Sequence, residues 1–152
     1  GAQVAGMVAF MVISVFMFNR FMAVSHAPNA LTDLVTGLGL SPMAVLLAVI
    51  ALYLVLGCFM EVFAAIMLTL PFVYPTITAL GFDPIWFGVL VVRLMEIGLI
   101  TPPVGLNCYV LSGAIEVPVT TVFRGIAPFL LADVVHVAIL ILWPELALYL
   151  VR

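Results

Sequence analysis

The residue types most able to do chemistry in this sequence interrupt an apolar segment at residues 96–107. The pair Pro102-Pro103 removes two backbone donors and cannot continue a helix. In a membrane, such a break is tolerated only where protein or a polar cavity satisfies the carbonyls that it frees. Thr101 and Asn107 flank the prolines and carry side-chain oxygens. Neutral oxygens and freed carbonyls suit a sodium ion, so the pattern predicts either an ion or substrate site or simple capping of two half-helices.

A second interruption lies at residues 57–61, where Gly57 and Glu61 break another apolar run. A carboxylate within a membrane helix is costly and is a functional candidate by default. We interpret Glu61 either as a cation ligand or as a carboxylate hydrogen-bonded to a neighbouring helix. The run 43–70 would be about 42 Å long as one straight helix, which exceeds a single hydrocarbon thickness. We therefore expect a kinked helix or a hairpin that turns near Gly57.

Two basic residues lie inside apolar runs. Arg93 and Glu96 are three apart, which places them on one helix face and predicts an ion pair. Arg20 has two interpretations: its long side chain reaches the membrane interface, or it meets an anionic substrate, with Asn19 beside it supplying an amide.

No catalytic motif is present: HExxH, GxSxG and the P-loop are all missing from the sequence, so we expect neither an enzyme nor an organic cofactor. Cys58 and Cys108 form no CxxC pair and are expected to be buried thiols. Asp133 and His136 are three apart, and they are interpreted either as a proton relay or as polar groups that a peripheral helix packs inward.

The composition indicates a multi-pass membrane protein. Of 152 residues, 67% are hydrophobic and only 7% are charged, whereas soluble domains carry about a quarter charged residues. Several apolar stretches reach the roughly 20 residues that cross a bilayer. No basic run suggests nucleic acid as a partner; the expected surroundings are lipid. Because the chain opens at Gly1 inside an apolar run, we expect a fragment that lacks its N-terminal part.

The expected fold is all-α, a polytopic membrane protein with discontinuous helices and a re-entrant hairpin as one option. Ser41-Pro42 and Asp83-Pro84 are predicted helix starts, since each joins a capping side chain to a proline. The predicted helices cover residues 2–24, 43–70 with its interruption, 85–100, 106–115 and 128–150. The predicted connections are a turn at 25–29, a short amphipathic piece at 30–38 along the interface, an exit after Pro71 and Pro75, and a polar link at 116–125. Arg152 is expected to close the last helix at an interface.

Four motifs follow one another along the chain: Gly57-Cys-Phe-Met-Glu61, Pro71-x-x-x-Pro75, Leu80-Gly-Phe-Asp-Pro-Ile-Trp-Phe-Gly88 and Glu96-Ile-Gly-Leu-Ile-Thr-Pro-Pro-Val-Gly-Leu-Asn107. Together they resemble the C-terminal part of the large permease (DctM-type, M subunit) of TRAP transporters, over residues 18–128. The resemblance implies a tripartite ATP-independent periplasmic transporter of the bacterial inner membrane. In such a transporter a periplasmic binding protein delivers an organic acid, often a C4-dicarboxylate or sialic acid, to a small Q subunit and the large M subunit.

The resemblance also implies how the M subunit works. It would move the substrate with sodium as coupling ion, using two inverted repeats with re-entrant hairpins and broken helices. Residues 1–152 would then form one portion, the second repeat, so that half of the expected site lies outside this chain. Two alternatives stay open: another ion-coupled anion transporter that needs no binding protein, and an intramembrane enzyme using Glu61, Glu96 or His136. A third is that the fragment has no activity alone.

The predicted ion-binding residues are Gly57, Glu61, Thr101, Pro102, Gly105 and Asn107. The resemblance implies that Thr101, Pro102, Gly105 and Asn107 match the ion-site region of the family's second repeat. By motif position, Glu61 stands where the family usually has aspartate. We expect carbonyls near Gly57 and Thr101 to hold sodium while Glu61 shapes the field. The predicted substrate-binding residues are Arg20 and Asn19. Arg93 and the pair Ser14-Val15 depart from the family pattern.

Overall fold

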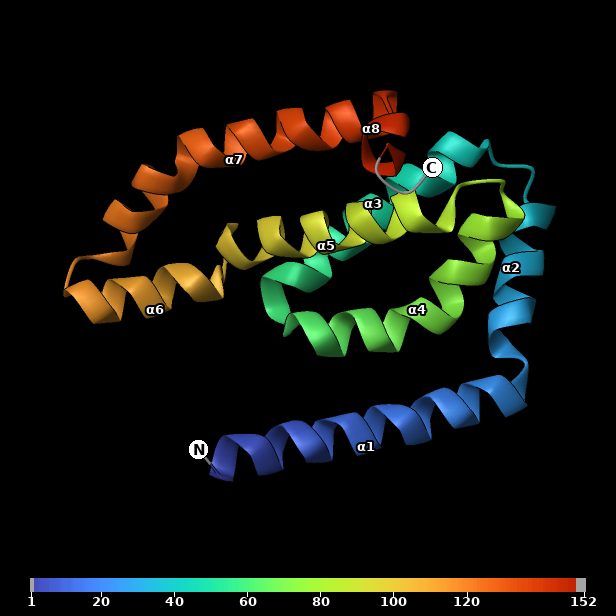
Figure 1. The fold of residues 1–152 in the computed structure, drawn as a ribbon, viewed down its shortest axis with the longest axis horizontal. Coiled ribbons are helices and arrows are strands. Elements are labelled where there is room, and N and C mark those ends of the chain that lie inside the picture. The colour runs from blue at the N-terminus through green and yellow to red at the C-terminus, as the bar shows by residue number, and fades with distance from the viewer. Residues whose placement is uncertain (1, 150–152) are drawn as a thin grey trace.

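The computed structural model describes residues 2–149, and within that range every regular element is a helix (Figure 1). The helices are α1 (Ala2–Ser25), α2 (Ala27–Gly37), α3 (Pro42–Phe59), α4 (Val62–Ala79), α5 (Pro84–Ile100), α6 (Leu106–Ile115), α7 (Val119–Leu142) and α8 (Glu145–Leu148). The all-α prediction is confirmed. The predicted role of Arg152 lies outside the described residues.

Four of these helices are long and apolar enough to cross a membrane: α1, α3, α4 and α7. α5 has 17 residues and α6 has 10, or about 25 Å and 15 Å at 1.5 Å per residue. Each is therefore shorter than a hydrocarbon core of about 30 Å, as expected for two half-helices on either side of a break. The chain is a polytopic membrane protein.

The interruption at residues 57–61 is a hairpin, not a kink. α3 ends at Phe59, α4 begins at Val62, and the two helices run back along each other (Figure 1). The Thr69 hydroxyl donates to the Tyr53 hydroxyl at 2.8 Å, and these residues lie eight positions to either side of Glu61. A contact at equal distances from the turn is the signature of an antiparallel pair.

The predicted end of a helix at Pro71 and Pro75 is wrong, because α4 continues through both prolines to Ala79. Each proline removes one helical hydrogen bond, and α4 bends in its second half (Figure 1). Threonine hydroxyls bond carbonyls in the bent region: Thr76 donates to Phe72 at 2.9 Å and Thr78 to Tyr74 at 2.9 Å. The prolines themselves free the carbonyls of Met67 and Pro71, so α4 stays helical through its remaining backbone bonds.

The predicted link at 116–125 is also wrong, since only residues 116–118 connect α6 to α7. Glu116 adopts a left-handed conformation that ends α6, and Pro118 precedes α7. Pro128, the predicted start of the last helix, lies inside α7. This helix ends at Leu142, well before the predicted end near residue 150, and Pro144 precedes the separate helix α8.

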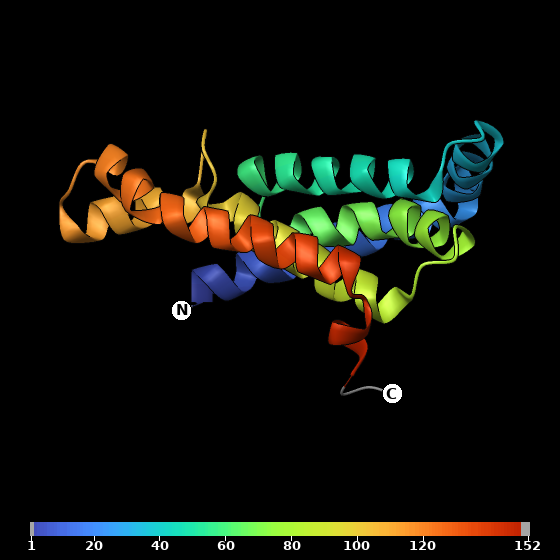
Figure 2. The same cartoon turned by 90° about the horizontal axis from the view of Figure 1, so that it is seen from above.

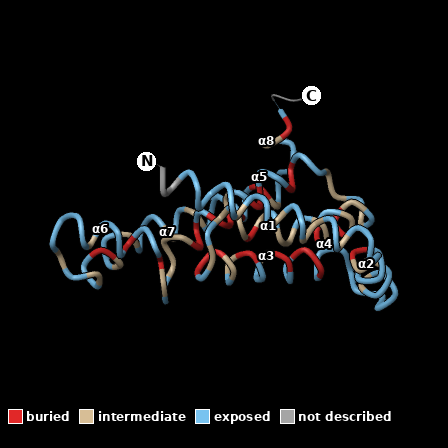
Figure 3. Tube along the Cα trace, turned by 90° about the horizontal axis from the view of Figure 1, so that it is seen from below, coloured by how far each residue is buried: buried red, intermediate tan, exposed pale blue. Residues whose placement is uncertain are grey.

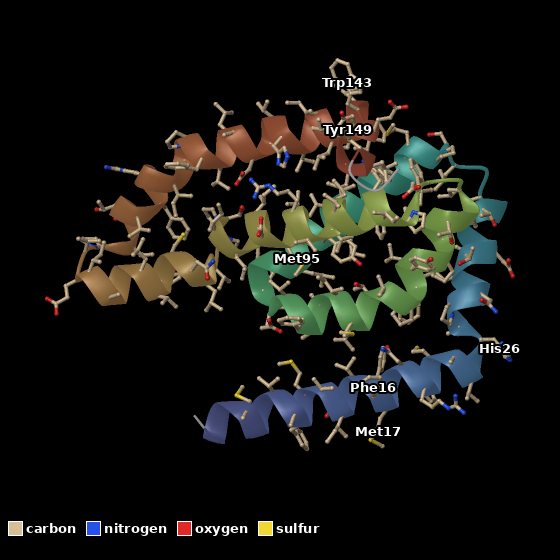
Figure 4. The ribbon with its side chains drawn as sticks, in the orientation of Figure 1. Phe16, Met17, His26, Met95, Trp143 and Tyr149 are labelled. Carbon is tan, nitrogen blue, oxygen red and sulfur yellow. The ribbon has the colours of Figure 1, made fainter. Side chains whose placement is uncertain are left out.

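The turn predicted at residues 25–29 is narrower than expected. Only His26, at φ 55°, leaves the helical conformation, and it forms the corner between α1 and α2 (Figure 4). Pro28 stands in the first turn of α2, where its missing donor costs nothing. Both predicted helix starts are confirmed: the Ser41 hydroxyl accepts from Ala44 N at 3.3 Å, and the Asp83 carboxylate accepts from Ile85 N at 2.8 Å.

The core is built around α5, which packs against the α3–α4 hairpin. Most of the fully buried side chains come from α3, α4 and α5, whereas α1 is exposed along almost all of its length (Figure 3). Met95 is fully buried and points from α5 toward the hairpin (Figure 4). Seen from above, α3 lies along one side of the molecule and α8 projects from the other (Figure 2). The break after α5 is therefore anchored by the best-packed helix.

Candidate functional site

The tip of the hairpin touches the end of α5 through two glycines. A Cβ atom added to Gly98 would lie 2.5 Å from the Cα atom of Gly57, and one added to Gly57 would lie 3.0 Å from the Cα atom of Gly98. Both residues are buried. The two backbones are thus in direct contact, and no side chain fits between them.

The contact continues into the break itself. The Cys58 thiol lies 3.9 Å from the carbonyl oxygen of Pro102. α5 ends at Ile100, Thr101 is extended, and the Pro102–Pro103 peptide bond is cis. The two interruptions predicted from the sequence, at residues 57–61 and 101–105, therefore meet in space.

The break exposes backbone oxygens on the α5 side. Pro102 and Pro103 have no N–H group, so the carbonyls of Gly98 and Leu99 lose their helical partners. Gly98 regains one donor, because the Thr101 N–H bonds its carbonyl at 3.2 Å. The Thr101 hydroxyl donates to the Ile97 carbonyl at 2.6 Å, which leaves its lone pairs as acceptors.

The other side of the break is held by α6 and α7. Gly105 has φ +52°, and a Cβ atom there would lie 2.8 Å from a ring carbon of Phe123. The Phe123 ring also meets Tyr109 edge to face, with centroids 6.2 Å apart. The Cys108 thiol donates to the Ile100 carbonyl at 3.5 Å. Two features favour glycine at position 105: its left-handed backbone conformation and the Phe123 ring that lies where a Cβ atom would be.

Four helix ends surround this point: the carboxyl ends of α3 and α5 and the amino ends of α4 and α6. Carboxyl ends carry partial negative charge and attract cations, whereas amino ends carry partial positive charge and attract anions. Transporters use such paired half-helix ends to hold a coupling cation beside an anionic substrate. The two chain breaks therefore bring together helix ends of both polarities.

The structure places the predicted ion-binding residues unequally. Gly57, Pro102, Thr101 and Gly105 belong to the contact just described, and Thr101 O would lie 3.3 Å from a Cβ atom on Gly105. Asn107 is exposed in the first turn of α6.

Glu61 sits differently: its carboxylate accepts from Ala64 N at 3.0 Å and caps α4. The bond is to the helix that Glu61 itself begins and not to a neighbouring helix as the second interpretation had it, and Glu61 makes no bond to the break among the described residues.

A pocket with a volume of about 580 Å³ lies between α1 and α4. Of the two predicted substrate residues, only Asn19 lines it. Its walls are apolar except for Asn19 and Glu61, and Phe16 is among the lining residues, while Met17 points away from α4 (Figure 4). The Asn19 amide oxygen is buried and has no hydrogen-bond partner among the described residues. Arg20 is exposed and does not line the pocket.

Comparison with known proteins identifies the family. A family model described as the DctM component of tripartite ATP-independent periplasmic transporters matches residues 1–146. The chain belongs to the DctM family. This family consists of transporter permeases, as the sequence motifs indicated.

Within the DctM family, named relatives share about a third of their residues with this chain. A sialic acid TRAP transporter large permease protein of Vibrio cholerae is 35% identical over 94% of the chain, and this match covers 34% of the relative. A C4-dicarboxylate TRAP transporter large permease protein of Pseudomonas aeruginosa is 38% identical over 95% of the chain and is also covered to 34%. An isethionate TRAP transporter permease protein of Oleidesulfovibrio alaskensis is 31% identical over 85% of the chain, with 20% of the relative covered. The chain spans about a third of the length of the first two relatives.

Sequence reasoning missed several residues that shape the site in this DctM-family chain. Gly98 is a helical residue of α5, and its missing side chain permits the close approach to Gly57. The cover that Phe123 provides for Gly105 was not foreseen. A pair of glycines on two neighbouring apolar helices was the available signal, because small residues let membrane helices touch.

The predicted ion pair of Arg93 and Glu96 is confirmed at 2.7 Å. The pair belongs to a cluster with more members than the sequence predicted. Arg93 also pairs with Asp133 and donates to His136 Nδ1 at 3.1 Å. Asp133 is half-buried, as expected if α7 packs its polar groups inward, whereas His136 is exposed. Both cysteines are free and buried, as predicted.

Proposed function

We propose that this chain forms part of the large membrane subunit of a TRAP transporter that takes up organic acids together with sodium. The single observation that carries the proposal is the contact between the hairpin tip and the break, where Gly57 meets Gly98 and the Cys58 thiol meets the Pro102 carbonyl. Two interrupted helices that expose backbone oxygens to each other are the structure that secondary transporters use at their ion sites. No step of the proposed function needs catalysis.

Sodium is the proposed ligand of the α5 side of the break. Its oxygens would be the carbonyls released near Thr101, those at the carboxyl end of α3 around Gly57, and the side chains of Thr101 and Asn107. Glu61, which caps α4, would contribute through its charge. Hard monovalent cations favour such neutral oxygen sets at a carboxyl helix end.

The partners and location follow from the family and from the names of relatives. We propose a small Q-type membrane subunit, a periplasmic solute-binding protein and the bacterial inner membrane. Relatives named for sialic acid and C4-dicarboxylates support an organic acid as the substrate. The chain would be one of two inverted repeats, and the rest of the transporter would complete the path.

The direct test is uptake of a C4-dicarboxylate or sialic acid into liposomes that contain the full-length permease with its Q subunit and binding protein. The proposal predicts accumulation that requires an inward sodium gradient and stops when potassium replaces sodium. Equal uptake in the two salts would refute sodium coupling, and uptake without the binding protein would favour the simpler anion transporter.

We expect Arg20→Ala to raise the substrate concentration for half-maximal uptake by about tenfold, because an arginine–carboxylate pair contributes roughly 1.4 kcal/mol or more. The sodium dependence should stay unchanged, since Arg20 is on α1 and exposed, outside the hairpin contact. Arg124→Ala is the matched control, because Arg124 is an exposed arginine on α7. Unchanged substrate affinity in Arg20→Ala would remove Arg20 from the substrate site.

A further inference from the structure

α7 is attached to both sides of the break, at three successive places. Near its start, the Phe123 ring covers Gly105. Near its middle, Asp133 and His136 bond Arg93 of α5. Near its end, the Leu140 carbonyl accepts from the Trp86 indole N–H at 2.7 Å. Residue numbers rise along α7 as they fall along α5, so α7 lies antiparallel to α5 and continues past it to α6 (Figure 1).

The middle attachment uses all three nitrogens of the Arg93 guanidinium group. Nη1 bonds Glu96 on the same helix at 2.7 Å, Nη2 pairs with Asp133, and Nε donates to His136 Nδ1 at 3.1 Å. The ring nitrogen Nδ1 of His136 is thus the acceptor of this hydrogen bond. Two of the three partners come from α7, so the guanidinium group joins the two helices.

The position of this cluster makes the loss of one charged partner costly. Asp133 lies about 21 Å from the first residue of α7 and about 14 Å from the last, at 1.5 Å per residue. A spanning helix places such a residue within the hydrocarbon depth, where an unpaired charge is costly. The side chains of Arg93 and Asp133 are 29% and 15% exposed, so protein covers most of the pair.

We propose that Arg93 is a positioning residue for the ion site, acting with Asp133 and His136 as a clamp between α5 and α7. Arg93 is eight residues before Thr101, or about 12 Å along α5, so it does not reach the break itself. The clamp fixes the half-helix whose end carries the break, while Phe123 fixes the far side of the same break. The effect on sodium rests on the proposed function, whereas the effect on the geometry of the break does not.

The test compares two variants that each remove one carboxylate from Arg93. Asp133→Asn removes the charged partner of Arg93 on the neighbouring helix, and Glu96→Gln removes the charged partner within α5; each amide oxygen can accept only an uncharged, weaker hydrogen bond. The reporter is the rate at which a membrane-permeant maleimide labels Cys58 in the full-length permease carrying Cys108→Ala, with thermal unfolding followed in parallel. Cys58 is buried against the Pro102 carbonyl, so labelling measures separation of the hairpin from the break.

We expect Asp133→Asn to raise the Cys58 labelling rate on the order of tenfold through local opening, and Glu96→Gln to leave it near the wild-type rate. Asp133→Glu keeps a carboxylate and should restore slow labelling. The sodium concentration for half-maximal uptake should rise in Asp133→Asn more than the maximal rate falls.

Wild-type labelling in Asp133→Asn, or equal opening in Asp133→Asn and Glu96→Gln, would overturn the clamp. If uptake by the wild-type transporter does not depend on sodium, the proposed sodium coupling is wrong. The Cys58 labelling rates would still test whether Arg93 and Asp133 hold α5 and α7 together.

Discussion

Gly98→Ala should abolish sodium-driven uptake by the full-length permease. The added methyl group would lie 2.5 Å from the Cα atom and 2.6 Å from the carbonyl carbon of Gly57. Backbone atoms cannot rotate away as a side chain can, so α3 and α5 must separate, at a cost of roughly 1–3 kcal/mol. The separation moves the hairpin tip away from the break, and both halves of the proposed ion site lose their geometry.

The matched control for this prediction is Gly88→Ala on the same helix. A Cβ atom at Gly88 meets nothing within 4 Å, so this change should leave uptake intact and stabilise the helix slightly. Gly57→Ala should give an intermediate loss, because its closest contact would be 3.0 Å. The measurement is initial uptake rate together with thermal unfolding in detergent. Full activity in Gly98→Ala would show that the contact is not needed for transport.

Replacing the side-chain oxygens of the break should give the second large effect. Thr101→Ala and Asn107→Ala are each expected to raise the sodium concentration for half-maximal uptake by about tenfold, the equivalent of roughly 1.4 kcal/mol. Together they should remove the sodium dependence. Thr101→Ser keeps the hydroxyl group and should behave like wild type.

The control for the oxygen replacements is Thr120→Ala, at an exposed position on α7. Sodium dependence is measured at saturating substrate, so that altered substrate binding does not distort it. Normal sodium-dependent uptake by the double variant Thr101→Ala with Asn107→Ala would show that the ion binds elsewhere.

Local chemistry made parts of this fold predictable. The bounds of α6 agree with the prediction from sequence, because Gly105 and Glu116 mark its two ends. The caps at Ser41 and Asp83 also agree, since a capping side chain followed by proline acts within its own turn. The hairpin near Gly57 was one of two alternatives, and it followed from the length of the apolar run 43–70.

The wrong predictions concern helix bounds that depend on the membrane and on tertiary packing, which a short sequence pattern does not report. Pro71 and Pro75 were read by the rule for water-soluble helices, but within a membrane a helix keeps its remaining bonds and bends. The polar residues at 116–125 suggested a link, yet most of them lie on the exposed surface of α7.

The residue patterns predicted the two parts of the site, whereas only the family resemblance predicted that these parts meet. Each interruption was visible from its glycine, proline and polar residues. Their meeting depends on Gly57 and Gly98, whose small size indicated that two helices could touch but not which two would do so. The partners of Arg93 on α7 were likewise hidden, because a spacing of three residues identifies neighbours on one helix only.

The central claim is that the hairpin tip and the break together bind sodium. The most direct measurement is the rate of maleimide labelling of Cys58 in the permease whose single change is Cys108→Ala, in sodium and in potassium at equal ionic strength. Because Cys58 faces the Pro102 carbonyl, bound sodium should hold the two elements together and slow labelling several-fold relative to potassium. Equal rates in the two salts would contradict the claim.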